Sequence, residues 1–181
     1  MKIEQIETQR LYLRQTLIED KENIYRLLSN EEVVKNLNLT IHSSIEDTEK
    51  LLSDYFSGLE NCTKYPYTII DKENGKFVGV FLIKLDLYNE DAYEFTIYLS
   101  KEFWGKGIYK EILPYMIKVA FEDIKTGNFR GYAMEKNIAS IKVLEKSNFK
   151  LEKIFKVDGI NDMIYSFLIT NDMYKSWRDK C

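Results

Sequence analysis

Cysteine, histidine and proline are scarce in this chain of 181 residues, which contains two Cys, one His and two Pro. The two cysteines, Cys62 and Cys181, provide neither a disulfide framework nor the spacing of a metal site. His42 alone cannot build a multi-histidine metal centre, so we interpret it as an ordinary polar side chain and expect no metal cofactor. Reduced thiols are typical of the cytoplasm, and we expect the protein there.

Long apolar runs are also missing. No stretch of about 18 apolar residues is present, so we expect no membrane span, and charged residues interrupt the first residues where a signal peptide would be apolar. The chain has no basic excess, because its formal net charge is −3. This balance argues against nucleic acid as the main partner and is compatible with a cationic substrate such as an amine.

The overall composition is typical of a globular protein. Apolar residues make up 45% of the chain and charged residues 30%, which is enough to bury a core. We find no internal repeat, low-complexity tract or Gly/Ser/Pro-rich linker. The sequence therefore predicts a single domain over residues 1–181.

Hydrophobic periodicity predicts alternating groups of strands and helices. The expected strands are 11–14, 65–71, 77–86, 93–99, 129–134, 151–157 and 163–169. The first expected helix follows a capping-box pattern at Thr16 and Glu19. The other expected helices are 44–56, a segment that starts near 107, 138–147 and a short one around 173–177. Asn74-Gly75 indicates a tight hairpin turn, for which both residues supply positive φ angles. Pro114 predicts a kink or a displaced start in the third helix. This order predicts an α/β fold with a mixed sheet.

The most informative segment is Phe103-Trp-Gly-Lys-Gly-Ile-Tyr-Lys110, between a strand and an amphipathic helix. Two glycines allow the backbone to approach a ligand closely, and free N–H groups at a helix start favour phosphate. Lys106 and Lys110 add positive charge. The segment therefore indicates a phosphate site, although an ordinary turn with surface lysines remains an alternative.

Two other phosphate-binding motifs do not match. A Walker A loop needs a leading Gly and a Ser or Thr after its Lys, whereas Gly107 follows Lys106 here. A dinucleotide fingerprint needs a third Gly where Lys110 stands, and the preceding strands read as hairpins rather than a βαβ unit.

Three segments carry a resemblance to a known family. Trp104-Gly-Lys-Gly107 resembles the acetyl-CoA pyrophosphate loop of GNAT acetyltransferases, written Gln/Arg-x-x-Gly-x-Gly/Ala. Thr8-Gln-Arg-Leu-Tyr-Leu-Arg14, with Glu32-Val-Val34 after it, resembles the opening of the branch that acetylates ribosomal-protein N-termini. The helix segment Asn137 to Lys146, followed by Phe149, resembles the "N-x-A-S-x-x-V-L-E-K-x-G-F" motif of that branch. The resemblance spans about residues 7 to 156.

The resemblance implies an N-acetyltransferase that uses acetyl-CoA as acetyl donor, with a mostly antiparallel central sheet flanked by helices in one GNAT domain. It places a backbone N–H of Tyr98 or Leu99 at the thioester oxygen. The implied cofactor-binding residues are Tyr98, Leu99, Trp104, Gly105, Lys106, Gly107, Ile108, Tyr109, Lys110 and Asn137.

Two side chains are candidates for proton handling. Glu94, on the strand before the loop, is our candidate base, acting through water; a solvent-facing Glu with a cross-strand Lys partner is an equally open interpretation. Ser140 is the candidate donor to the leaving thiol, and an ordinary residue of a first helical turn is the alternative. Asn137 is both a candidate pantetheine ligand and a good helix N-cap.

The sequence departs from the family pattern at several positions. Tyr109 stands where Gly or Ala usually allows approach to the pyrophosphate, so its ring must point away or reshape the cofactor site. Leu144 replaces a Tyr that protonates the thiolate in many relatives, and Asn148 replaces the Gly of the last motif. The changes at Tyr109 and Leu144 motivate the hypothesis of a CoA-binding regulatory module without turnover, whereas Asn148 can adopt the left-handed conformation of a helix cap.

The acceptor is less defined than the donor. A protein or peptide N-terminal amine is one expectation, and a small amine such as a polyamine or an aminoglycoside is another. We expect residues 30–62 and the last hairpin to form the acceptor groove, where an inward-pointing Glu46 or Glu60 would favour small cations. The sequence allows a monomer or a homodimer.

Overall fold

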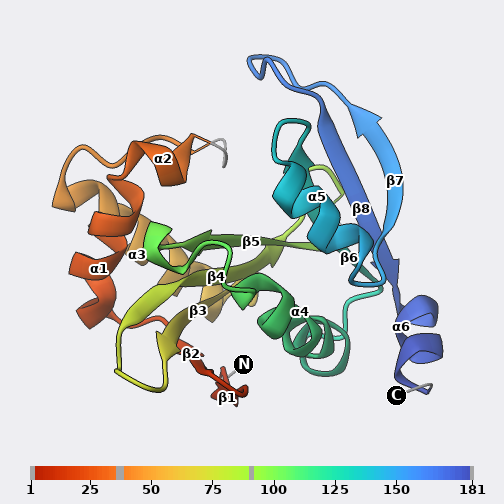
Figure 1. Ribbon diagram of the computed structural model, residues 1–181, viewed down its shortest axis with the longest axis horizontal. Helices are drawn as coiled ribbons and strands as arrows, with labels where there is room; N and C mark the ends of the chain where they lie inside the picture. The colour runs from red at the N-terminus through yellow and green to blue at the C-terminus, as the bar shows by residue number, and fades with distance from the viewer. Residues whose placement is uncertain (1–2, 36–38, 90–91, 180–181) are drawn as a thin grey trace. The chain divides into compact units, whose positions relative to one another are not determined.

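A computed structural model describes residues 3–35, 39–89 and 92–179, so Cys181 lies outside the described residues. The chain divides into two compact units, Met1–Lys84 with Ile97–Ile108 (unit 1) and Leu85–Thr96 with Tyr109–Cys181 (unit 2). In the described residues the strands hydrogen-bond in the order β1-β2-β3-β4-β5-β6-β8-β7 (Figure 1). The prediction of one domain over the whole chain stays a prediction.

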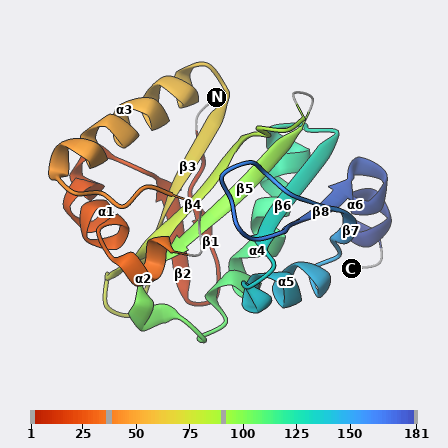
Figure 2. The same cartoon turned by 90° about the horizontal axis from the view of Figure 1, so that it is seen from above.

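Unit 1 is built on antiparallel strands. Strands β1 (Ile6–Glu7), β2 (Leu11–Gln15), β3 (Lys64–Asp71) and β4 (Phe77–Leu85) pair successively, and the end of β5 (Tyr93–Leu99) belongs to the same unit. Helices α1 (Lys21–Leu28), α2 (Glu31–Val34) and α3 (Ile45–Glu60) accompany them, with α3 lying along β3 (Figure 2). Their buried core is Ile24, Leu27, Leu28, Val33, Leu52, Tyr55, Val80, Leu82 and Tyr98.

Unit 2 combines one parallel pair with two antiparallel pairs. The start of β5 pairs parallel with β6 (Asn128–Met134), and β8 (Ile164–Thr170) pairs antiparallel with both β6 and β7 (Lys150–Phe155). Its helices are α4 (Ile108–Lys118), the π-helical turn η3 (Val119–Asp123), α5 (Ile138–Glu145) and α6 (Asn171–Arg178). Because β5 and β6 are parallel, residues paired in register share a face of the sheet.

The predicted mixed, mostly antiparallel α/β fold is confirmed, with local corrections. Gly58 lies inside α3 rather than after it. Gly58 is buried, and a Cβ added there would meet the Lys64 side chain at 2.6 Å. In the β3–β4 turn only Gly75 has a positive φ, of 69°, so Asn74 does not adopt the left-handed conformation expected. Asn148 does adopt it, with φ 64°.

The first helical region also differs in its cap. Asp20, rather than Glu19, accepts the Leu17 N–H at 2.9 Å. The buried Asp20 carboxylate also accepts the Thr68 hydroxyl at 2.8 Å. The short helix α2 was not predicted. Helix α4 runs through Pro114 to Lys118, so the predicted kink there stays a prediction. Within the described residues no helix is long and apolar enough to cross a membrane.

Candidate functional site

The loop between β5 and α4 has two left-handed glycines. After the 3₁₀ turn η2 (Lys101–Phe103), Gly105 has a φ of 71° and Gly107 a φ of 74°. A Cβ added at Gly105 would meet nothing within 4 Å, and one at Gly107 would meet only the Arg10 guanidinium at 3.9 Å. The backbone of this loop is therefore open to close approach by a ligand.

Side chains of unit 1 hold this loop in place. The Trp104 indole Nε1 donates to the Leu99 carbonyl at 2.8 Å, which ties the loop to the end of β5. The Arg10 Nη2 donates to the Lys106 carbonyl at 3.0 Å. Lys106 places its ammonium 5.1 Å from the centre of the Phe103 ring. The structure thus brings Leu99, Trp104 and Lys106 together and adds Arg10, which we had not predicted as a site residue.

The first turn of α4 follows the loop directly. Ile108 is buried and Lys110 is exposed. The Tyr109 ring packs edge-on against Phe95, with centroids 6.1 Å apart, and burial raises the pKa of Tyr109. The ring of Tyr109 is therefore part of an aromatic cluster in unit 2, which accounts for a large residue at this position.

Tyr98 has a structural side chain. It is 5% exposed and belongs to the unit 1 core with Tyr55, whose pKa is raised by burial and by the neighbouring Tyr98. Any contact of Tyr98 with a cofactor would thus come from its backbone, as the family resemblance implies.

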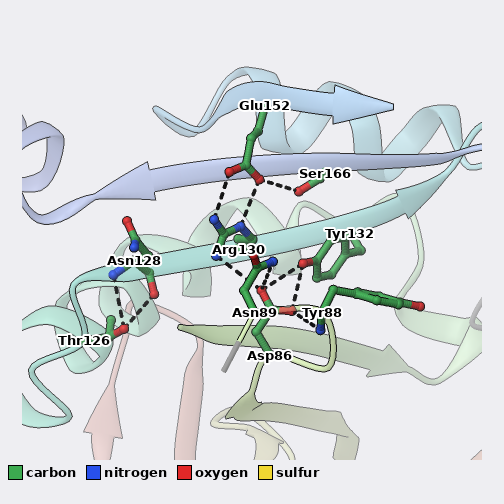
Figure 3. Close-up of polar contacts among 9 residues, drawn as sticks. All are labelled: Asp86, Tyr88, Asn89, Thr126, Asn128, Arg130, Tyr132, Glu152 and Ser166. Carbon is green, nitrogen blue, oxygen red and sulfur yellow. Dashed lines mark hydrogen bonds and ion pairs between the residues drawn. The ribbon is translucent and has the colours of Figure 1, made fainter. Parts of the chain in front are cut away.

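A buried polar cluster lies on one face of the unit 2 sheet (Figure 3). Arg130, on β6, donates from Nε to Glu152 Oε2 at 2.9 Å and from Nη2 to Glu152 Oε1 at 2.8 Å, and its Nη1 lies 3.4 Å from Asp86 Oδ2. The Tyr132 hydroxyl lies 2.8 Å from the same Asp86 oxygen and donates to this carboxylate. The Ser166 hydroxyl donates to Glu152 at 2.9 Å.

Glu94 belongs to this cluster. It pairs in parallel register with Arg130, so both side chains lie on the same face, and Glu94 is only 5% exposed. Burial and the negative charges of Glu94 and Asp86 raise the pKa of Tyr88. Burial, the hydrogen bond to Asp86 and these charges also raise the pKa of Tyr132. Glu94 is therefore not solvent-facing, whereas the cross-strand Lys partner of that interpretation and the role of Glu94 as base both stay predictions.

The N-terminal turn of α5 carries the remaining predicted residues. The Asn137 side chain accepts the Ser140 N–H at 3.2 Å, which confirms Asn137 as the N-cap. Ser140 is partly exposed. Leu144 is fully buried, and a Cβ on Gly131 would meet its side chain at 2.6 Å, so this position is filled by core packing rather than by an acid.

The acceptor side is less defined. Glu46 and Glu60 are both exposed. A pocket of about 280 Å³ in unit 1 is lined by Asn23, Arg26, Leu27, Asn30, Val33, Lys76, Phe77, Ser100, Lys101 and Glu102. Neither Glu46 nor Glu60 lines it, so the described pocket is not the acidic one that a small cation would favour.

The geometry of the loop agrees with a family assignment. A family model described as "Acetyltransferase (GNAT) domain" matches residues 10–150. The chain belongs to this family.

Relatives and solved structures support the assignment. An uncharacterized N-acetyltransferase, p20 of Bacillus licheniformis, is 25% identical over 158 residues, which are 85% of this chain and 86% of that protein. The ribosomal L7/L12 alpha-N-protein acetyltransferase RimL, in complex with coenzyme A, superposes with a TM-score of 0.81 at 19% identity, covering 94% of this chain and 99% of that chain. A spermidine N-acetyltransferase from Vibrio cholerae, in complex with CoA and spermine, has a TM-score of 0.79 at 17% identity, covering 91% and 98% of the two chains. The structural likenesses confirm the GNAT fold.

Sequence reasoning missed most of the polar cluster of this GNAT chain. Asp86, Arg130, Tyr132, Glu152 and Ser166 were not predicted, although Arg130 and Tyr132 alternate with apolar residues in β6. A charged residue at a buried position of a strand needs partners, and this alternation was the signal available.

Proposed function

We propose that the protein is an acetyl-CoA-dependent N-acetyltransferase whose acceptor is the α-amine of a peptide or protein N-terminus. The observation that supports it is the loop from Trp104 to Gly107, with two left-handed glycines open on their Cβ side. An extended anion such as the CoA pyrophosphate fits this loop, because backbone N–H groups there and at the start of α4 are suited to phosphate oxygens.

We assign the cofactor contacts as follows. Gly105, Lys106, Gly107 and the first turn of α4, Ile108, Tyr109 and Lys110, would hold the pyrophosphate through backbone N–H groups and lysine charge. Trp104 shapes the loop through its bond to Leu99. Asn137 would contact the pantetheine arm in addition to capping α5. Bound acetyl-CoA would supply the activated acetyl group.

The transfer forms a C–N bond to the acceptor nitrogen and breaks the thioester C–S bond; the amine loses one proton and the thiolate gains one. We propose that Glu94 takes the amine proton through a water molecule. Ser140 would hydrogen-bond the departing sulfur, and a backbone N–H of Tyr98 or Leu99 would donate to the thioester oxygen.

The free-energy cost of deprotonation supports an α-amine as acceptor, because a carboxylate is a much weaker base than an amine. Deprotonating an α-amine with a pKa of about 7.7–8.0 costs about 1 kcal/mol at pH 7, whereas a lysine-like amine costs about 4–5 kcal/mol. A small polyamine or aminoglycoside amine is the competing acceptor class, and the solved relatives include enzymes named for each class.

Calorimetric titration of acetyl-CoA tests the donor site. We expect saturable binding by the protein and its loss in Gly107→Glu, which adds bulk and negative charge to the loop. Gly159→Glu is the matched control, because Gly159 also has a positive φ, of 82°, and open space around it. Equal binding by the two variants, or no binding by the unaltered protein, would overturn the cofactor assignment.

Thiol release with an acceptor panel tests the acceptor. We expect turnover with short peptides bearing a free N-terminus and none with the same peptides blocked at the N-terminus. Turnover with spermidine or an aminoglycoside alone would identify a small-amine enzyme. Acetyl-CoA binding without turnover on any amine would identify a binding module.

The proposed enzyme works as one domain in the cytoplasm. The family match over residues 10–150, with strands of both units in it, supports one functional domain. The exposed position of Cys62 is compatible with a reducing compartment.

A further inference from the structure

The pocket of unit 1 gathers several hydrogen-bond donors in one place. Its volume of about 280 Å³ is close to the lower end of the range of small-molecule pockets. Asn23 and Arg26 on α1, Asn30 at the cap of α2 and Ser100 after β5 line it together. Convergent polar groups in a pocket are typical of a binding site, so their chemistry indicates the ligand.

These polar groups are largely unused within the protein. The Asn30 Oδ1 accepts the Glu32 N–H at 3.0 Å, which leaves the NH₂ group of Asn30 to donate. In the part of the chain that the structure describes, no partner binds the side chains of Asn23, Arg26 or Ser100. Acceptor oxygens of a ligand would pair with all four lining groups.

The charge of the pocket also favours an anion. Lys76 and Lys101 line it together with Arg26, and Glu102 is the acidic residue of the lining. The Lys76 Nζ lies 3.9 Å from Glu102 Oε2, and the Lys101 Nζ lies 2.7 Å from Glu32 Oε1. Each lysine thus has a carboxylate partner, whereas the described residues offer none to Arg26. One unmatched guanidinium is suited to one carboxylate, because its planar fork fits the two oxygens.

The rest of the lining is apolar. Leu27 and Val33 are buried and Phe77 is partly buried. Glu22, one turn before Arg26 on α1, lies outside the lining. An aspartate or glutamate side chain has a short apolar stem and a carboxylate head, so it fits this combination better than an inorganic anion would.

The pocket adjoins the position proposed for the thioester. Ser100 directly follows Leu99, whose backbone N–H is a proposed donor to the thioester oxygen, and both belong to unit 1. Consecutive Cα atoms are about 3.8 Å apart, so the Cα atoms of Ser100 and Lys101 lie within about 4 and 8 Å of that of Leu99. An extended peptide advances about 3.3–3.6 Å per residue. A side chain one to three residues from the acetylated terminus can therefore reach the pocket.

We propose that this pocket is the specificity site for the acceptor peptide and binds an aspartate or glutamate side chain at position 2, 3 or 4 of that peptide. Arg26 holds the carboxylate, and Asn23, Asn30 and Ser100 donate further hydrogen bonds to the acidic residue. The inference rests on the proposed function, acetylation of a peptide N-terminus, and adds the class of peptide that is acetylated.

A peptide panel gives the main test. Hexapeptides of Ser and Ala, amidated at the C-terminus, carry one Glu or one Gln at position 2, 3 or 4, and kcat/KM of acetylation is measured for each pair. We expect a preference for Glu of about threefold to tenfold at one or more positions, mainly through KM. Turnover with equal KM for Glu and Gln at all three positions overturns the inference and leaves the proposed function standing. If no peptide is acetylated, the proposed function fails and the inference fails with it.

Arg26→Gln should abolish the preference. We expect KM for the Glu peptide to rise about threefold to tenfold, to the value for the Gln peptide, with KM for the Gln peptide and the Kd of acetyl-CoA unchanged. Arg26→Lys keeps the charge without the planar fork and should keep part of the preference. Arg178→Gln, at an exposed arginine of α6, is the matched control and should keep all of it. An equal rise of KM for both peptides in Arg26→Gln would show that Arg26 does not recognise the carboxylate, and would overturn the inference.

The side-chain amides of Asn23 and Asn30 report directly on occupation of the pocket. Their NH₂ signals in ¹⁵N-edited NMR spectra, assigned through Asn23→Asp and Asn30→Asp, should shift when the Glu peptide is added with CoA, but not in Arg26→Gln. The NH₂ signal of the exposed Asn61 is the reference. Glutarate tests a free anion as the source of the same chemistry. If glutarate shifts the two signals and the Glu peptide does not, the pocket binds a small free anion and its assignment to the acceptor peptide is overturned.

Discussion

The indole of Trp104 donates a hydrogen bond to the carbonyl of Leu99 at 2.8 Å and so closes the glycine loop onto the end of β5. The Trp104 side chain is otherwise well exposed, at 40% of the residue surface. A large aromatic residue that is not buried in the core, but bonded to the backbone at the start of the loop, has its main effect on the shape of that loop.

Trp104→Phe should therefore weaken acetyl-CoA binding more than it weakens the fold. Loss of one hydrogen bond of about 0.5–1.5 kcal/mol predicts about a threefold to tenfold higher Kd, with a small change in melting temperature. Calorimetry and thermal unfolding measure both quantities, and Trp177→Phe in α6 is the matched control. A lower melting temperature with an unchanged Kd would show that Trp104 serves the fold alone.

Arg10, the residue just before β2, should stabilise the same loop. Its guanidinium donates to the Lys106 carbonyl at 3.0 Å although the side chain is exposed. Arg10→Met should raise the Kd for acetyl-CoA about threefold to tenfold, because the loop loses a fixed contact before the ligand arrives. Arg26→Met, at an exposed arginine of α1, is the control, and equal Kd values for the two variants would contradict the role of Arg10.

Local signals explain what the sequence could predict. The strand from Tyr93 to Leu99 and the Asn137 cap were predicted because alternation and capping act within a few residues. The open loop was predicted for the same reason, since Gly105 and Gly107 are only two positions apart in a short segment.

Long-range pairing explains what the sequence could not predict. The contact of Arg130 with Asp86 joins residues 44 positions apart, and that with Glu152 joins residues 22 positions apart. Only the strand order β5-β6-β8-β7 brings these residues onto one face.

Asp20 should make unfolding of the protein pH-dependent. Burial raises the pKa of Asp20, but hydrogen bonds from Arg14, the Leu17 N–H and Thr68 outweigh it, so the net pKa is lowered. A carboxyl with a lowered folded-state pKa stabilises the fold above its unfolded value of about 3.9, and this contribution is lost as the pH falls below it.

Asp20→Asn should cost about 1–3 kcal/mol of unfolding free energy at pH 7, because the Arg14 guanidinium loses its charged partner. The difference from the unaltered protein should shrink as the pH falls from about 5 to about 3, which denaturant titrations at several pH values can follow. Asp54→Asn, which removes an exposed ion pair with Lys64, should cost less than about 1 kcal/mol. A difference for Asp20→Asn that stays constant with pH would contradict this account.

Tyr174 should attach α6 to the rest of unit 2. Its ring stacks on Phe121 with centroids 4.9 Å apart, and its hydroxyl donates to Glu122 in the π-helical turn. Tyr174→Ala should lower the free energy of unfolding by about 3–5 kcal/mol through the lost ring, and Tyr174→Phe by about 0.5–1.5 kcal/mol through the lost hydrogen bond.

Burial and this hydrogen bond raise the pKa of Tyr174 to about 12, so the stabilisation by the hydroxyl should be complete below about pH 10 and disappear as the pH rises through 12. Denaturant unfolding and amide hydrogen exchange of α6 measure these effects, and Tyr115→Phe, at an exposed tyrosine, is the control. If the α6 amides stay protected from exchange in Tyr174→Ala, another contact holds the helix.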